Sequence, residues 1–125
     1  MFILYVDDDK EDQQIFCEAV AMIDISIDCI CVNDPNEAMG ILERTSPLPD
    51  YIFTDFNMPR KDGKDFLRYL KTHSKYKDIP VIILSTGIRK DDEAEFRKLG
   101  ARKAFPKPST FNELVAIIQS TIATR

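Results

Sequence analysis

The sequence predicts an α/β fold, a doubly wound parallel sheet of five strands covered by five helices. Short apolar runs alternate along the chain with longer amphipathic stretches, which is the rhythm of repeated strand–helix units. Several of the runs are apolar at consecutive positions, as in parallel strands covered on both faces. Units of this kind connect through right-handed crossovers and place helices on both faces of one sheet.

The apolar runs give the expected strands 2–6, 28–32, 51–54, 81–84 and 103–105. The clearest helix follows Thr110, where apolar residues recur on one helical face and Glu113 completes a capping box. A second helix begins after Asp34, with Pro35 in its first turn. The other helices are expected near 11–22, near 64–73 and just before Gly100.

Length and composition indicate one globular domain over 1–125, large enough to bury a core without disulfide or metal staples. A net charge of −4 argues against a nucleic-acid partner. Basic residues do gather near the fourth helix, but acids interleave with them, as on a solvated helix face. Because no apolar run is long enough to span a membrane and no signal peptide is present, we expect a cytoplasmic protein.

The three cysteines are expected to be buried, reduced thiols. A metal site at Cys29 and Cys31 is the alternative. His73 is the only histidine, and two thiolates alone are too few for a closed zinc site. The sequence therefore favours packing thiols.

Polar side chains follow the expected strands at their carboxyl ends, where the loops of a doubly wound sheet converge. These side chains belong to Asp7, Asp8, Asp9, Asp55, Asn57, Ser85 and Lys107. Taken singly, each has a structural explanation as a helix cap, a turn former, a strand end or a lone solvated cation.

Together, carboxylates at one corner repel one another and need a positive charge to stay ionised. Mg²⁺ supplies that charge and prefers oxygen ligands. Lys107 can pair with an arriving anionic group, and Ser85 can donate a hydrogen bond to it. This set of groups suits phosphoryl transfer to a carboxylate nucleophile, where catalysis is mainly positioning and charge neutralisation.

The chain resembles a response-regulator receiver domain of the chemotaxis CheY type over essentially its whole length. The resemblance is carried by the segments 3–9, 54–59 with Asp62 and Gly63, 80–86, 99–101 and 105–108. It implies a flavodoxin-like, CheY-like sheet with strand order 2-1-3-4-5. Weaker similarity in the Asp-Ile-Pro-Val, Ser-Thr-Gly and Lys-Pro-Ser segments points to the subgroup paired with phytochrome-type kinases.

By resemblance, Asp55 is the phosphoacceptor and receives the group from a histidine kinase or a phosphotransfer protein. The implied Mg²⁺ ligands are Asp8 and Asp55 through carboxylate oxygens, Asn57 through its backbone carbonyl and Asp7 through water. Lys107 contacts the phosphate, the Ser85 hydroxyl turns towards it, and the Lys107–Pro108 bond is cis. Beyond its own phosphorylation and slow dephosphorylation, the domain is not expected to be an enzyme.

Two positions depart from the common family pattern. Receivers usually carry Tyr or Phe on the fifth strand three residues before the lysine, where this chain has Ala104, with Phe105 one place later. The residue after the switch hydroxyl is usually Ala, and here it is the bulkier Thr86. The first departure puts coupled switching of a hydroxyl and an aromatic ring in doubt, and the second narrows access to the phosphoryl group.

Three functions remain open from the sequence. The first is a stand-alone phosphoacceptor that signals to an unknown downstream protein through changed binding, with homodimerisation on phosphorylation as one output. The second is a Mg²⁺-dependent phosphohydrolase with an aspartyl nucleophile, which Asn57 disfavours because dehalogenase-type phosphatases place an acid there. The third is a receiver-like interaction module that is never phosphorylated, which the complete set of site residues disfavours.

Overall fold

A parallel sheet forms the centre of the molecule in the computed structural model, which describes residues 1–56 and 63–123. Its strands are β1 (Phe2–Val6), β2 (Asp28–Val32), β3 (Tyr51–Thr54), β4 (Val81–Ser85) and β5 (Lys103–Pro106). The spatial order is β2-β1-β3-β4-β5, and every neighbouring pair is parallel. The predicted strand positions and the predicted order are therefore confirmed, with β4 and β5 each one residue longer than expected.

Helices connect successive strands, as repeated strand–helix units require. They are α1 (Lys10–Ile23), α2 (Pro35–Arg44), α3 (Gly63–Thr72), α4 (Glu93–Lys98) and α5 (Phe111–Ala123), with a 3₁₀ turn over Lys90–Asp92 before α4. The Asp34 side chain caps α2 by accepting from the backbone N–H of Glu37 at 2.9 Å. Gly100 follows α4 with φ of 111°, the left-handed conformation expected of a residue at a helix end.

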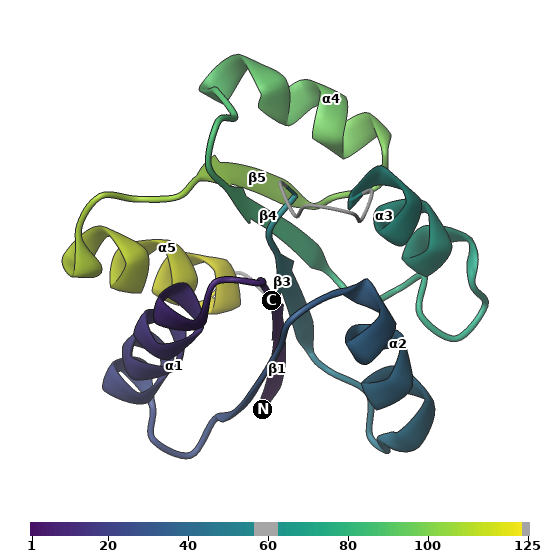
Figure 1. The fold of residues 1–125 in the computed structure, drawn as a ribbon, viewed down its shortest axis with the longest axis horizontal. Coiled ribbons are helices and arrows are strands. Elements are labelled where there is room, and N and C mark those ends of the chain that lie inside the picture. Colours follow the sequence, from purple (N-terminus) through teal and green to yellow (C-terminus); the bar gives the residue numbers. More distant parts are fainter. Residues whose placement is uncertain (57–62, 124–125) are drawn as a thin grey trace.

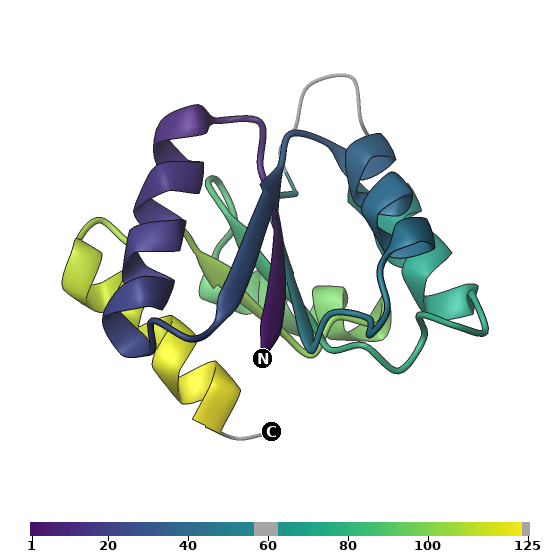
Figure 2. The same ribbon diagram turned by 90° about the horizontal axis from the view of Figure 1, so that it is seen from below.

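The helices divide between the two faces of the sheet (Figure 1). One core packs Phe16 of α1 and Ile118 of α5 against Tyr5, Phe53 and other residues of the strands. The opposite core joins residues of α2, α3 and α4 to the other face. Figure 2 shows the same layers from a second direction, with the sheet between the two groups of helices. Within the described ranges, no helix is long and apolar enough to cross a membrane.

The parallel arrangement brings the carboxyl ends of β1, β3, β4 and β5 to one edge of the sheet. Backbone hydrogen bonds fix the register there, because Asp55 N donates to Val6 O at 2.8 Å and Lys107 N donates to Ser85 O at 3.0 Å. Asp7 N likewise donates to Val32 O at 3.0 Å. The residues that follow these strands are thus held beside one another by the ladder itself.

Candidate functional site

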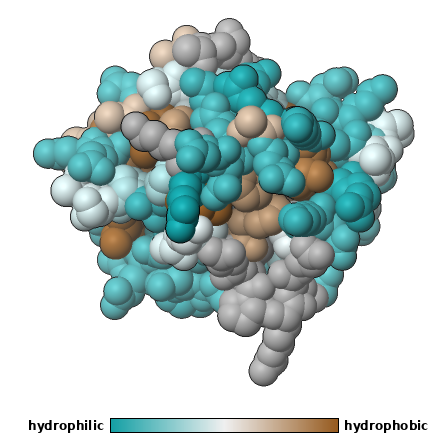
Figure 3. Space-filling model, turned by 90° about the horizontal axis from the view of Figure 1, so that it is seen from above, coloured by the Kyte–Doolittle hydropathy of each residue, from teal (hydrophilic) through white to brown (hydrophobic). Residues whose placement is uncertain are grey.

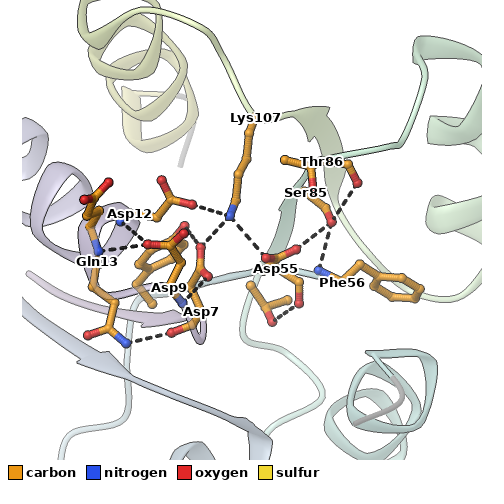
Figure 4. Close-up of polar contacts among 12 residues, drawn as sticks. Asp7, Asp9, Asp12, Gln13, Asp55, Phe56, Ser85, Thr86 and Lys107 are labelled. Carbon is orange, nitrogen blue, oxygen red and sulfur yellow. Dashed lines mark hydrogen bonds and ion pairs between the residues drawn. The ribbon is translucent and has the colours of Figure 1, made fainter. Parts of the chain in front are cut away.

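The candidate site is an acidic corner at the carboxyl edge of the sheet, closed by one lysine (Figure 4). Asp7 and Ser85 are completely buried and Asp55 is 4% exposed, whereas Asp8 is exposed. Asp7 and Asp8 follow β1, Asp55 follows β3, and Ser85 ends β4. The structure therefore brings together the predicted residues that it describes.

Lys107 is the central cation of this corner. Its Nζ lies 2.7 Å from Asp7 Oδ2, 2.7 Å from Asp12 Oδ2 and 3.1 Å from Asp55 Oδ2. Burial lowers the pKa of Lys107, but hydrogen bonds to Asp12 and Asp7 outweigh that effect and leave the pKa above its usual value. Lys107 therefore stays protonated at neutral pH and neutralises only part of the negative charge around it.

Asp7 is anchored more fully than the sequence indicated. Tyr5 Oη donates to Asp7 Oδ2 at 2.6 Å, and the backbone N–H of Asp9 donates to Asp7 Oδ1 at 2.9 Å. Gln13 Nε2 donates to the Asp7 carbonyl at 2.6 Å. Burial raises the pKa of Asp7, and hydrogen bonds from Lys107 and Tyr5 oppose the rise. Burial also raises the pKa of Tyr5, so its hydroxyl remains a donor at neutral pH.

Ser85 links the candidate acceptor to the neighbouring loop. Its Oγ donates to Asp55 Oδ1 at 2.6 Å and accepts from the backbone N–H of Phe56 at 3.2 Å. Together with the Lys107 contact to Oδ2, this bond leaves each oxygen of the Asp55 carboxylate held by a donor. The acceptor is thus oriented from β4 on one side and from β5 on the other.

The acidic corner fits a hard cation. Carboxylate oxygens of Asp7, Asp8 and Asp55 lie within 4.8 Å of one another, close enough to share one ion. Two of these carboxylates are buried, and Lys107 also pairs with Asp12, so the corner keeps an excess of negative charge. Oxygen donors in this number suit Mg²⁺ or a similar divalent ion. The remaining predicted ligand, the Asn57 carbonyl, lies outside the described residues.

Three contacts of the site were missed in the sequence, namely those of Tyr5, Asp12 and Gln13. Tyr5 is near the end of β1 and Asp7 directly follows that strand, two residues later, and residues at this spacing share one face of extended chain. Asp12 lies in the first turn of α1, three residues after the cap residue Asp9. These spacings were visible in the sequence, although the packing angle of α1 on the sheet was not.

The structure corrects two expectations and sharpens one. The Lys107–Pro108 bond is not cis, because among the described residues only Ser46–Pro47 is cis. The backbone hydrogen bond from Lys107 N to Ser85 O holds Lys107 beside the end of β4, next to the site. The cysteines are free but only partly buried. Asp9 has the structural role considered for it, since its side chain accepts from two backbone N–H groups as the N-cap of α1.

Ala104 and Phe105 face opposite sides of the sheet. Ala104 is buried in the core beneath α2, α3 and α4, whereas Phe105 packs on the side of α1 and α5. Successive residues of a strand point to opposite faces. Phe105 therefore cannot fill the position that an aromatic residue at 104 would occupy.

Comparisons with known proteins agree with this geometry. A family model described as the response regulator receiver domain matches residues 3–119. Response regulator Rcp1 of Synechocystis is 30% identical over 94% of this chain and 83% of its own length. The transcriptional regulatory protein CpxR of Escherichia coli is 33% identical over 96% of this chain, which spans 48% of CpxR.

Solved structures give the same result. The phosphorylated cyanobacterial phytochrome response regulator RcpA superposes with a TM-score of 0.83 at 31% identity, over 96% of this chain and 89% of that one. The Mn²⁺-bound form of Rcp1 gives a TM-score of 0.80 at 30% identity, over 95% and 89% of the two chains. The chain belongs to the response regulator receiver domain family, whose members serve phosphorelay signalling in two-component systems.

Proposed function

We propose that Asp55 accepts a phosphoryl group from a histidine kinase or a phosphotransfer protein. The observation that carries this proposal is the position of the Asp55 carboxylate. It lies between the Ser85 hydroxyl at 2.6 Å and the Lys107 amine at 3.1 Å, with carboxylate oxygens of Asp7 and Asp8 in reach of a shared cation. An incoming phosphoryl group requires hydrogen-bond donors beside the nucleophile and carboxylates that hold a cation next to it.

In the proposed step an oxygen of Asp55 attacks the phosphorus of the donor. A new P–O bond forms while the bond from phosphorus to the donor's histidine nitrogen breaks, and the nitrogen keeps the electron pair. Lys107 and Ser85 then transfer their hydrogen bonds from the free carboxylate to the phosphoryl oxygens. Attack of water on the phosphorus then breaks the bond to Asp55, releases inorganic phosphate and returns Asp55 to its carboxylate.

Asp8 and Asp55 are proposed to hold Mg²⁺ through carboxylate oxygens, Asp7 through water and Asn57 through its backbone carbonyl. When bound, the ion neutralises the carboxylates and the oxygens of the transferred group. The Mn²⁺-bound structure of the relative Rcp1 supports a divalent ion in this family. The chain's own contribution is orientation, because Tyr5, Lys107 and the Asp9 N–H fix Asp7 in place.

The proposed donor is a phytochrome-type histidine kinase. RcpA is described as a cyanobacterial phytochrome response regulator, and RPA3017 of R. palustris as a response regulator in red light signalling. The latter superposes with a TM-score of 0.84 at 26% identity. We expect labelled phosphate to be transferred faster from an autophosphorylated phytochrome-type kinase than from a chemotaxis-type kinase. Equal rates would contradict this choice of donor.

The proposed output is a change in protein binding, including self-association on phosphorylation. Figure 3 views the molecule from the side of α4, and the surface there is mainly hydrophilic with scattered apolar residues. On α4, Arg97 pairs with Glu93 at 3.2 Å, which supports a solvated helix face over a nucleic-acid surface. A surface of mixed charge suits a transient protein partner.

The test is incubation with acetyl phosphate and Mg²⁺, followed by intact mass measurement. We expect the mass of one added phosphoryl group in the wild type and none in Asp55→Asn, because the amide lacks the nucleophilic oxygen. Asp34→Asn is the matched control, since Asn also caps a helix and position 34 lies outside the site. An unchanged wild-type mass would refute the proposal.

A further inference from the structure

A second cluster of metal-ligating side chains lies outside the acidic corner, between α1 and the edge strand β2. Cys17 comes from α1, and Cys29 and Cys31 come from β2. Cys17 Sγ lies 3.0 Å from Cys31 Sγ and 3.6 Å from Cys29 Sγ. All three sulfur atoms lie within 4.8 Å of one another, and all are free thiols.

The fold explains why the three thiols converge. Cys29 and Cys31 are two residues apart on one strand, so their side chains share a face. α1 packs on that face, where both cysteines contact the core that contains Phe16 and Ala19. The turn of α1 after Phe16 delivers Cys17 to the pair, a contact that the separation in sequence conceals.

We propose that Cys17, Cys29 and Cys31 form a binding site for one soft, thiophilic metal ion. Thiolate ligands select ions such as Cu⁺ and Zn²⁺ over the hard Mg²⁺ of an oxygen site. Metal–sulfur bonds of about 2.3 Å place the sulfurs of one site about 3.8 Å apart. The observed separations of 3.0 and 3.6 Å reach that value with sub-ångström movements of side chains.

The donor set favours an ion that accepts three protein ligands. The single histidine of the chain, His73, stacks on Tyr76 at 4.2 Å, and Tyr76 belongs to the core on the opposite face of the sheet. It therefore cannot complete a four-ligand site. Three thiolates suffice for Cu⁺, while Zn²⁺ or Cd²⁺ would add a water as the fourth ligand.

Access and ionisation are compatible with binding. β2 is an edge strand and all three cysteines are partly exposed, so an ion can enter without opening the core. Ion binding displaces the protons of the thiols and releases them to solvent.

The experiment uses the full, reduced, untagged chain and two probes. Cd²⁺ is titrated while the thiolate-to-metal charge-transfer absorption is followed, and Cu⁺ is delivered from a chelator of known affinity. We expect one equivalent of either ion, unaffected by excess Mg²⁺. Displacement of the soft ion by Mg²⁺ would place it at the acidic corner and overturn the proposal, as would absence of binding.

Single variants test whether all three thiols are ligands. Loss of a group that only supports a ligand weakens metal sites about 10- to 100-fold, so loss of a ligand itself should weaken binding at least as much. We expect this loss of affinity in each of three single variants, Cys17→Ser, Cys29→Ser and Cys31→Ser. Ser120→Ala, at an exposed hydroxyl of α5, is the control and should bind as the wild type does. Any cysteine variant that is folded yet binds with wild-type affinity would refute the three-ligand site.

A measurement on the wild type alone covers the case in which a variant fails to fold. Bound ion should protect all three cysteines from alkylation by iodoacetamide, counted by intact mass, and removal of the ion should restore labelling. Alkylation unchanged by a bound ion would overturn the proposal. Phosphorylation of Cys29→Ser by acetyl phosphate, expected to match the wild type, is a separate readout for the acidic corner.

Discussion

The Ser85 hydroxyl donates a 2.6 Å hydrogen bond to Asp55 Oδ1. Both side chains are buried, and the same hydroxyl accepts from the backbone N–H of Phe56. In the proposed reaction the Asp55 carboxylate becomes an acyl phosphate, and we expect this bond to be exchanged for one to a phosphoryl oxygen. A conformational equilibrium shifts only through such differences in contact between two states.

Ser85→Ala should therefore weaken the response of the β4–α4 connection. Without the hydroxyl, the amide NMR shifts that beryllofluoride induces in residues 86–90 and α4 should become smaller than in the wild type. The lost bond to a carboxylate should also lower the free energy of unfolding by about 1.5–3 kcal/mol. Ser120→Ala, an exposed α5 hydroxyl, is the control. Shifts in α4 as large as those of the wild type would mean that the hydroxyl is not the relay.

Ala104 bears on the same relay. Because Ala104 and Phe105 face opposite sides of the sheet, the Phe105 ring does not lie where an aromatic side chain at position 104 would. The signal should then run through the β4–α4 connection without an aromatic toggle on β5. We predict that Phe105→Leu leaves the beryllofluoride-induced shifts in α4 unchanged in the same NMR comparison, and reduced shifts would assign the toggle to Phe105.

The two acids after β1 should differ in their effect on Mg²⁺. Asp8 is exposed and expected to ligate the ion directly, whereas Asp7 is buried and expected to act through water. Mg²⁺ at a hundredfold excess over its Kd should stabilise the wild type by about 2.7 kcal/mol. Asp8→Asn should lose more of this stabilisation than Asp7→Asn, as measured by thermal unfolding with and without Mg²⁺. Equal losses would contradict the assignment of Asp8 as the direct ligand.

On acidification, Mg²⁺ binding should begin to weaken at a higher pH than it would if Asp7 had the pKa of an ordinary carboxyl group. Burial raises the pKa of Asp7, so Asp7 takes up its proton above the usual value of about 3.9. A protonated Asp7 no longer attracts the ion, so affinity falls as the pH drops through this raised pKa. In the metal-free protein, by contrast, the Asp7 contribution to the free energy of unfolding should rise as the pH falls. Protonation relieves the cost of burying the ionised carboxylate. Fluorescence or calorimetric titrations across mildly acidic pH measure the first effect.

Tyr5→Phe isolates the cause of that pH dependence. The Tyr5 hydroxyl lowers the pKa of Asp7 through its 2.6 Å hydrogen bond, opposing burial. Its removal should move the pH midpoint of Mg²⁺ binding upward. Tyr51→Phe is a close control, since Tyr51 is buried and its hydroxyl has no hydrogen-bond partner in the described part of the chain. A midpoint that Tyr5→Phe leaves in place would show that Tyr5 does not tune Asp7.

The sequence predicted the strands well because several of them are short, continuous apolar runs followed by a polar residue. It predicted Asp7, Asp55, Ser85 and Lys107 as neighbours because parallel strands bring their carboxyl ends together. Asp12 was missed, since its contact with Lys107 depends on how α1 turns over the sheet. The same limit hid Cys17, which meets Cys29 and Cys31 only after α1 packs on β2.

The central claim is that Asp55 carries the phosphoryl group, and chemical trapping tests it most directly. Borohydride reduces an aspartyl phosphate to homoserine, which survives proteolysis and can be located by peptide mass spectrometry. After treatment with acetyl phosphate and Mg²⁺, we predict homoserine at position 55 and unmodified aspartate at positions 7, 8, 9 and 12. Homoserine at one of those four positions instead of position 55, or no homoserine at any position, would contradict the account.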